Sequence, residues 1–276
     1  MSNFNLTLNY NSNRNNRKNS YNVEELLNSI KDKIKNLNNI KIDNNYKVAI
    51  LIPTTNKGKK WNTAEETFLF NKSIKTLLNV TNENHNIIFY IGVDVDDSIW
   101  LKEENYKKII DLKKDRKNIY FNFFKMTDIS PGHVTQMWNK LFKYAYNDHC
   151  DYFLQCGDDI VFKTPNIIDD CIRMLKMHNN LGLTGPICDN PNILTQTFVS
   201  RKHMEIFNFY FPPQIKNWFC DDWINFVYSP TYYYPLLNHK CINSGGLPRY
   251  SVEYVNSLQN LVNNGKNSIL KYLKNK

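Results

Sequence analysis

The most informative part of this chain is the stretch Tyr152-Phe153-Leu154-Gln155-Cys156-Gly157-Asp158-Asp159-Ile160-Val161-Phe162. A mostly apolar segment reaches a glycine, two adjacent carboxylates follow, and the chain then turns apolar again. Two carboxylates at the end of a buried strand repel each other and are costly to desolvate. A divalent cation removes this cost because it neutralises both charges and takes oxygen ligands. The stretch therefore predicts a ligand site at the carboxyl end of a central strand, and the alternative is a solvated acidic turn.

Apolar residues on both sides of this stretch alternate between strand-like and helix-like spacing. Continuous apolar runs are typical of strands that are buried on both faces. The strand-like runs are 48–52, 87–93, 119–126 and 152–155, and the helical segments between them are 64–79, 101–114 and 131–145. This order predicts an α/β fold with a mostly parallel central sheet flanked by helices, a Rossmann-like three-layer sandwich.

The other segments complete one core domain with appendages. Residues 1–21 are rich in Asn, Ser and Arg and predict a disordered arm. Helical spacing in 22–45 predicts a helix that packs on the core domain at 46–250, and Val252, Val255 and Leu258 indicate a terminal helix within 251–276. Further helices are predicted at 166–178, at 201–208 and after Cys220, with strands at 181–184, 195–199 and 232–237.

Composition argues against several classes of protein. The 276 residues carry a net charge of +9, but the lysines are spread along the chain, so binding to nucleic acid is not expected. No apolar run reaches the roughly 18 residues that a membrane helix needs, and the first residues lack a secretory pattern. The six cysteines form no Cys-x-x-Cys pair, which favours free thiols. We therefore expect a cytoplasmic protein without a transmembrane segment.

Polar residues also follow the first two predicted strands. Pro53, Thr54 and Asn56 end the first, and Asp94 and Asp96 follow the second. These residues are expected at the same edge of the sheet as Asp158, where they would suit a nucleotide base or ribose. The alternative for Pro53, Thr54 and Asn56 is an ordinary strand exit, and the alternative for Asp94 and Asp96 is a turn that caps the next helix. Phosphate-binding loops of the Walker type and Gly-x-Gly-x-x-Gly are absent from the sequence. Phosphates would then have to be held through a metal ion.

Four segments resemble the GT-A nucleotide-sugar glycosyltransferases, most closely those like glycosyltransferase family 2. Residues 48–56 resemble the family's first strand and its exit, and residues 90–98 its acidic second strand end. Residues 132–159 include Asn139 and a shortened form of the Asp-x-Asp motif. The segment Trp218-Phe219-Cys220-Asp221-Asp222-Trp223 resembles the Glu-Asp-Trp segment that supplies the base. Together the four segments lie within residues 46–240.

The resemblance implies a metal-dependent transfer of a hexosyl or N-acetylhexosaminyl group from a nucleoside-diphosphate sugar, with a UDP-sugar as the best candidate. The acceptor would be a hydroxyl of a glycan, a protein or a lipid-linked molecule. Separate acidic groups for the leaving diphosphate and for the acceptor proton favour an inverting reaction. The implied site residues are Asp222, with Asp221 second, as the base; Pro53, Thr54, Asn56, Asp94, Asp96, Asn139 and Asp158 for the nucleotide; and Asp158, Asp159 and His239 for Mn²⁺ or Mg²⁺.

The chain departs from the family's pattern in two respects. No residue separates the two acids of the metal motif, and residues 185–218 lack a recognisable acceptor motif. Alternatives also stay open for several residues: Asp221 and Asp222 could cap a helix, His239 could be a surface residue, and 244–250 could be a linker instead of a lid with Arg249 on a phosphate. Two other functions remain as alternatives. One is a sugar nucleotidyltransferase, because Lys57-Gly58-Lys59-Lys60 approximates the basic phosphate loop that such enzymes have after the first strand, and the other is an inactive carbohydrate-binding module.

Overall fold

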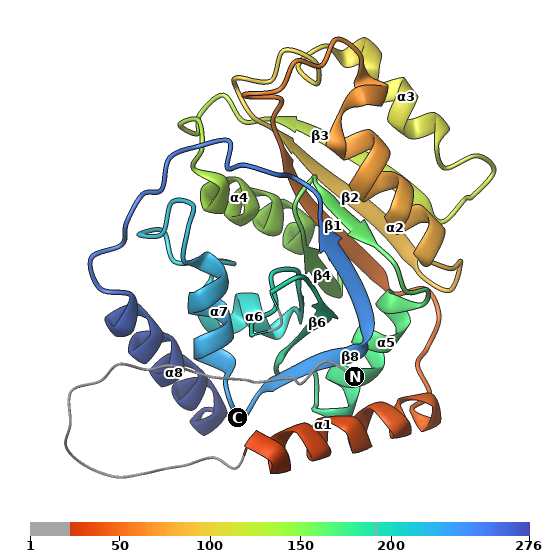
Figure 1. Cartoon of the computed structure of the whole chain (residues 1–276). Helices are drawn as coiled ribbons and strands as arrows, with labels where there is room; N and C mark the ends of the chain where they lie inside the picture. The colour runs from red at the N-terminus through yellow and green to blue at the C-terminus, as the bar shows by residue number, and fades with distance from the viewer. Residues whose placement is uncertain (1–22, 191) are drawn as a thin grey trace.

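The computed structural model describes residues 23–190 and 192–276, so the predicted arm at 1–21 lies outside the described residues. Within them, eight strands form one sheet with helices on both faces (Figure 1). The strands are β1 (Lys47–Thr54), β2 (Asn86–Val93), β3 (Ile119–Lys125), β4 (Tyr152–Gln155), β5 (Ile160–Phe162), β6 (Leu183–Ile187), β7 (Thr197–Ser200) and β8 (Tyr233–Asn243). The α-helices are α1 (Val23–Asn36), α2 (Lys75–Val80), α3 (Tyr106–Asp111), α4 (Val134–Asn147), α5 (Ile167–Met177), α6 (Lys202–Phe207), α7 (Cys220–Tyr228) and α8 (Leu258–Lys274).

The strand order is β3-β2-β1-β4-β7-β6-β8-β5. The first four strands are mutually parallel, with Val48 of β1 opposite Ile87 of β2 and Tyr152 of β4. Beyond β4 the sheet is mixed, because β7 is antiparallel to β4 while β6 and β8 are parallel to each other. The predicted α/β sandwich with a mostly parallel sheet is confirmed. The carboxyl ends of β1, β2 and β4 consequently meet at one edge.

The side chains of β1 explain why its apolar run is continuous. Successive residues of a strand point to opposite faces of the sheet. Val48, Ile50 and Ile52 pack into a core that includes residues of α2, α3 and α5. Ala49 and Leu51 pack into a second core with residues of α4, α6 and α7. Both faces of this strand are buried, which accounts for its continuous apolar run.

Several elements differ from the prediction. The segment at 64–79 is not one α-helix: it comprises a 3₁₀ turn (Ala64–Glu66), a π-helical turn (Leu69–Ile74) and α2. The helix predicted at 101–114 contracts to a 3₁₀ turn (Glu103–Asn105) and α3. Strand β5 was not predicted, because it is short and depends on antiparallel pairing with β8. Helix α8 begins at Leu258, so Val252 and Val255 precede it.

No helix among the described residues is long and apolar enough to cross a membrane.

Candidate active site

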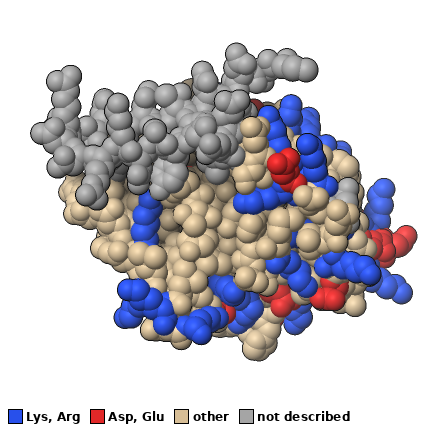
Figure 2. Space-filling model, turned by 90° about the horizontal axis from the view of Figure 1, so that it is seen from below, with Lys and Arg blue, Asp and Glu red and all other residues tan. Residues whose placement is uncertain are grey.

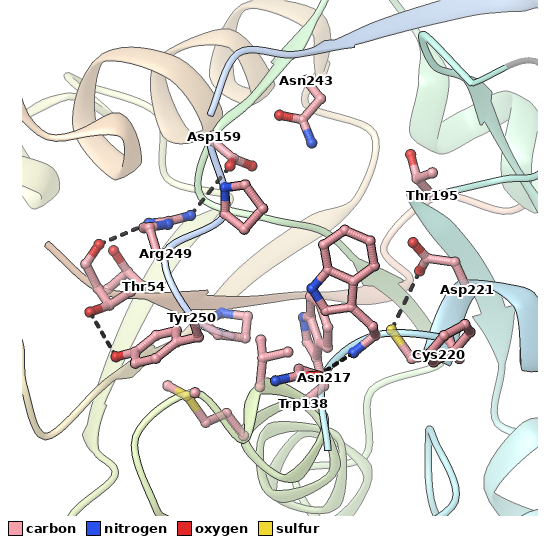
Figure 3. Close-up of a pocket in the computed structure, with 18 of the residues that line it drawn as sticks. Thr54, Trp138, Asp159, Thr195, Asn217, Cys220, Asp221, Asn243, Arg249 and Tyr250 are labelled. Atoms are coloured by element: carbon pink, nitrogen blue, oxygen red, sulfur yellow. Dashed lines mark hydrogen bonds and ion pairs between the residues drawn. The ribbon is translucent and has the colours of Figure 1, made fainter. Parts of the chain in front are cut away.

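A pocket of about 610 Å³ opens at the carboxyl ends of β1, β2 and β4. Its walls come from these strand ends, from the loop before β7, from the turn before α7 and from the segment after β8 (Figure 3). Asp94 and Asp159 line it from the sheet side, and Asp221 and Asp222 line it from α7. The fold therefore brings together three of the acidic segments that the sequence singled out.

The turn after β4 holds Asp158 and Asp159 through contacts with neighbouring segments. The amide of Gly157 donates to Gln196 Oε1 at 3.0 Å, and the amide of Ile160 donates to Ser73 Oγ of the π-helical turn at 3.0 Å. Asp158 is buried, and Thr54 Oγ1 donates to its Oδ2 at 2.8 Å. Burial, together with the charge of Asp158, raises the pKa of Asp159 to about 6.

A positive charge lies directly on this carboxylate pair. The guanidinium of Arg249 donates to both oxygens of Asp158, at 2.8 and 2.5 Å. Its Nη2 is 3.3 Å from Asp159 Oδ2, and its Nη1 also donates to the carbonyl of Thr55 at 2.8 Å. Arg249 belongs to residues 244–254, which lie in the chain between β8 and α8 and which we call the strap. Residues 246–250 of the strap line the pocket, and Arg249 and Tyr250 are drawn in Figure 3.

The acidic loop after β2 divides into three different environments. Asp94 is buried and faces the pocket, where its Oδ2 accepts a hydrogen bond from Tyr250 of the strap at 2.9 Å. Asp96 is an exposed partner of Lys57 at 3.2 Å and is not among the lining residues. Asp97 is buried and accepts from the amides of Ile99 and Trp100, which belong to a turn, so this side chain stabilises the turn after β2 and does not cap a helix.

Helix α7 begins beside the pocket and presents two carboxylates to it. Phe219, in the left-handed conformation with φ 70°, turns the chain into the helix. Cys220 Sγ donates to Asp221 Oδ1 at 3.7 Å. Burial and the neighbouring charge of Asp222 raise the pKa of Asp221 to about 7, whereas burial alone raises that of Asp222. In Figure 3 Asp221 lies across the pocket from Asp159 and Arg249, near Thr195.

Asn139 and Asn56, which were expected at the site, bind other parts of the chain instead. Asn139 of α4 donates to the carbonyl of Phe211 at 2.8 Å and accepts from two amides of the same segment. Asn56 binds Ser98 through both ends of its amide and so ties two strand exits together. Neither side chain is among the lining residues.

His239 does not join the acidic pair as a metal ligand. It lies on β8 and is buried, with Nε2 2.7 Å from Asp170 Oδ2 of α5. The interpretation as a surface residue is also wrong, since this histidine is buried and hydrogen-bonded to Asp170 inside the fold.

The remaining candidate ligands fit a divalent cation that is shared with a substrate. No group of three or more His, Cys, Asp or Glu side chains in the described part of the chain could hold a metal ion by itself. Mg²⁺ in phosphate-transferring sites is commonly held by one or two carboxylates and completed by substrate phosphates and water. Asp158 and Asp159 supply such a pair, and Arg249 now contacts both.

Several lining residues were not among the predicted site residues, among them Trp138, Thr195, Asn243, Trp218 and Tyr250. Trp138 belongs to the buried face of α4, and its indole Nε1 donates to the carbonyl of Leu51 beside the pocket at 3.2 Å. Tyr250 directly follows Arg249 in the segment 244–250, and this position is the signal in the sequence that points to it.

Solved structures resemble this fold. TarS 1–349 of S. aureus in complex with UDP-GlcNAc superimposes with a TM-score of 0.55 at 12% identity, over 80% of this chain and 66% of that protein. The mannosyltransferase PcManGT from Pyrobaculum calidifontis in complex with GDP-Man and Mn²⁺ gives a TM-score of 0.51 at 8% identity, with the same coverage of 80% and 66%. The chain thus spans just under two thirds of the length of these proteins. Their likeness, with the strand order above, shows the GT-A type of fold.

No protein-family model matches the chain, and no curated protein matches it.

Proposed function

We propose that this protein is a glycosyltransferase that moves a sugar from a nucleoside-diphosphate sugar to a hydroxyl acceptor. The observation that carries the proposal is the pocket with carboxylates on opposite walls, Asp94 and Asp159 toward the sheet and Asp221 and Asp222 on α7. Such a reaction needs one acidic group for the leaving diphosphate and another for the acceptor proton. The fold supports the same proposal, because two proteins of similar fold carry UDP-GlcNAc and GDP-Man.

The donor occupies the sheet side of the pocket in this proposal. Pro53, Thr54 and Asp94 contact the nucleoside, and Asp158 and Asp159 hold Mn²⁺ or Mg²⁺, which would neutralise charge on the diphosphate as it leaves. Of the nucleotides, we favour UDP. The lysines near the strap, Lys57 and Lys59, add positive charge beside the expected diphosphate position.

The acceptor occupies the side of α7. A general base works best when its pKa lies near the working pH, and the pKa of Asp221 is raised to about 7. We therefore place Asp221 before Asp222 as the base, the reverse of the order that the resemblance implied. Its carboxylate would take the proton from the acceptor hydroxyl while the sugar's bond to the diphosphate breaks. Attack from the face opposite the leaving group makes the transfer inverting.

An aromatic side chain stands at the entrance on this side. Trp218 lines the pocket, precedes the candidate base by three residues and is 46% exposed. Indole rings present a large apolar face that suits the C–H faces of a pyranose. We infer that Trp218 contacts the acceptor.

A donor panel tests the function. The purified protein is incubated with UDP- and GDP-sugars and Mn²⁺, and free nucleoside diphosphate is measured, with Asp159→Ala and an EDTA-treated sample as controls. We expect release from one donor class and loss of release in both controls. Release that survives both controls would contradict the metal site. Pyrophosphate release from a sugar phosphate and a nucleoside triphosphate would instead indicate a nucleotidyltransferase. Tight sugar binding without any release would indicate an inactive binding module.

A further inference from the structure

We propose that the strap is an internal occupant of the donor site, in which Arg249 takes the position of the divalent cation and Tyr250 that of the donor's nucleoside. The inference rests on the proposed function, since it names what competes with that donor. It makes Arg249 and the divalent cation alternative partners of one carboxylate pair.

The contacts of Arg249 indicate that it competes with the divalent cation. Its side chain is only 17% exposed, and its guanidinium contacts three carboxylate oxygens of the pair, two on Asp158 and one on Asp159. Bidentate guanidinium–carboxylate contacts are among the strongest hydrogen-bonded pairs in proteins. A divalent cation needs the same oxygens, and its charge repels the guanidinium at contact distance. Cation binding therefore requires Arg249 to leave Asp158.

The contacts of Tyr250 indicate that it competes with the nucleoside of the donor. Its hydroxyl donates to Asp94, the buried carboxylate at the end of β2. Its ring lies against Gly132, where an added Cβ would be 2.7 Å from the ring, so only a glycine allows this approach. The aromatic ring thus fills the space between the ends of β1 and β2 and the start of α4, which is where the proposed nucleoside would lie.

Tethers on both sides of these residues hold the strap down. Lys59 Nζ donates to the carbonyl of Gly245 at 2.9 Å. At the other end, Asn217 donates to the carbonyl of Ser251 at 3.0 Å and accepts from the amide of Glu253 at 3.0 Å. The same Asn217 Oδ1 accepts from the amide of Trp218 in the turn before α7. Displacement of the strap by a donor therefore loosens or reorients the acceptor side, which orders the reaction with the donor first.

The experiment measures binding of Mn²⁺ alone, by electron paramagnetic resonance, to four forms of the full chain. These are the wild type, Arg249→Gln, Arg249→Lys and the control Lys176→Gln, which removes the same charge at the opposite edge of the sheet, where Lys176 binds Tyr46. We expect Arg249→Gln to bind Mn²⁺ at least about tenfold more tightly, because a charged competitor is gone. Arg249→Lys should fall between it and the wild type, and Lys176→Gln should match the wild type.

Hydrogen exchange gives the second measurement. The amides of Ser244 and Glu253 are hydrogen-bonded in the strap as it stands. Their exchange should accelerate in Arg249→Gln without ligand and in the wild type on addition of UDP with Mn²⁺.

The inference is overturned if Arg249→Gln binds Mn²⁺ no more tightly than the wild type, or if exchange in the strap is unchanged by both the substitution and the ligands. These outcomes differ from failure of the proposed function, in which no form releases nucleotide from any sugar donor. Mn²⁺ affinity and exchange can still be read in that case.

Discussion

Asp221 and Asp222 are consecutive residues with different surroundings. Both line the pocket, but the pKa of Asp221 is raised to about 7, by burial and by its neighbour. Asp221→Asn is nearly isosteric and cannot accept a proton, so we expect kcat to fall by about 10²- to 10⁴-fold. Asp222→Asn is the matched variant and should have the smaller effect. UDP binding, measured by calorimetry, should be unchanged in both.

The assignment would be reversed if Asp222→Asn had the larger effect on kcat. It would be abandoned if Asp221→Asn lost UDP binding, because that residue would then belong to the donor site or to the fold.

The same residue predicts the pH dependence of turnover. A base must be deprotonated to act, so kcat should rise with pH through about 7 and level off above it. In Asp221→Asn the residual kcat should lack this limb. A profile recorded from pH 5.5 to 9 checks the expectation, and an unchanged limb in Asp221→Asn would assign it to another group.

Asp94 and Asp96 offer a second matched pair on the donor side. Asp94 is buried in the pocket wall, whereas Asp96 is an exposed partner of Lys57. We expect Asp94→Asn to raise the KM for the donor by about tenfold or more with a smaller change in kcat, the pattern of lost ground-state binding. Asp96→Asn should leave both constants near wild type. Equal effects of the two changes in steady-state assays would show that position in the pocket does not decide the role.

At the scale of elements, one side chain joins the strap to the turn before α7. Asn217 is buried and makes hydrogen bonds to Trp218, Ser251 and Glu253. Asn217→Ala should lower the free energy of unfolding by about 1–3 kcal/mol, because backbone groups of two segments lose their partner. It should also lower kcat, since the strap and the base turn no longer move together.

Denaturant unfolding and donor-saturated rates measure the two effects of Asn217→Ala. The control is Asn263→Ala on α8, where Asn263 only accepts a bond from exposed Gln259. A loss of stability with kcat unchanged would show that Asn217 has a structural role only. It would contradict the proposal that Asn217 couples the strap to the turn before α7.

The elements also show where local pattern is sufficient. The strand at 152–155 has the bounds that were predicted, because Tyr152, Phe153 and Leu154 are apolar, all four residues are buried, and the pairing partner β1 is a buried apolar strand. The segment 64–79 departs from the prediction because Ser73 in the π-helical turn bonds the acidic turn, through Gly157 and Ile160. A contact over more than eighty residues overrides helix propensity there.

For the whole molecule, the raised pKa of Asp221 makes a prediction about stability. Its pKa is about 7 in the folded chain against 3.8 for the free group, so the folded state holds this proton more strongly. The contribution of this proton to the free energy of unfolding is therefore fully present below about pH 4 and is lost as the pH rises through about 7. Asp221→Asn removes this dependence.

At pH 8 we expect Asp221→Asn to have a higher Tm than the wild type, by about 2–4 °C for each kcal/mol gained in the free energy of unfolding. The difference in Tm should shrink toward pH 5.5. Thermal melts at the two pH values check this. A difference in Tm that is the same at both pH values would show that burial does not disfavour the charged form of Asp221.

The alternation of apolar runs in the sequence was sufficient to predict the α/β sandwich and the parallel order of its first strands, because burial on both faces leaves a local signature. The carboxyl ends of those strands follow from the same pattern, and so do the positions of Asp94, Asp158 and Asp159 near one edge.

The roles of individual side chains at that edge depended on the tertiary structure. The pattern could not separate Asp94 from Asp96. The resemblance assigned Asn139 and His239 to the site, whereas in the structure Asn139 binds the backbone near Phe211 and His239 binds Asp170. Arg249 reaches Asp158 across 91 residues. Which side chains meet over such separations depends on the pairing of β8 and on the path of the chain beyond it, and no local spacing encodes either.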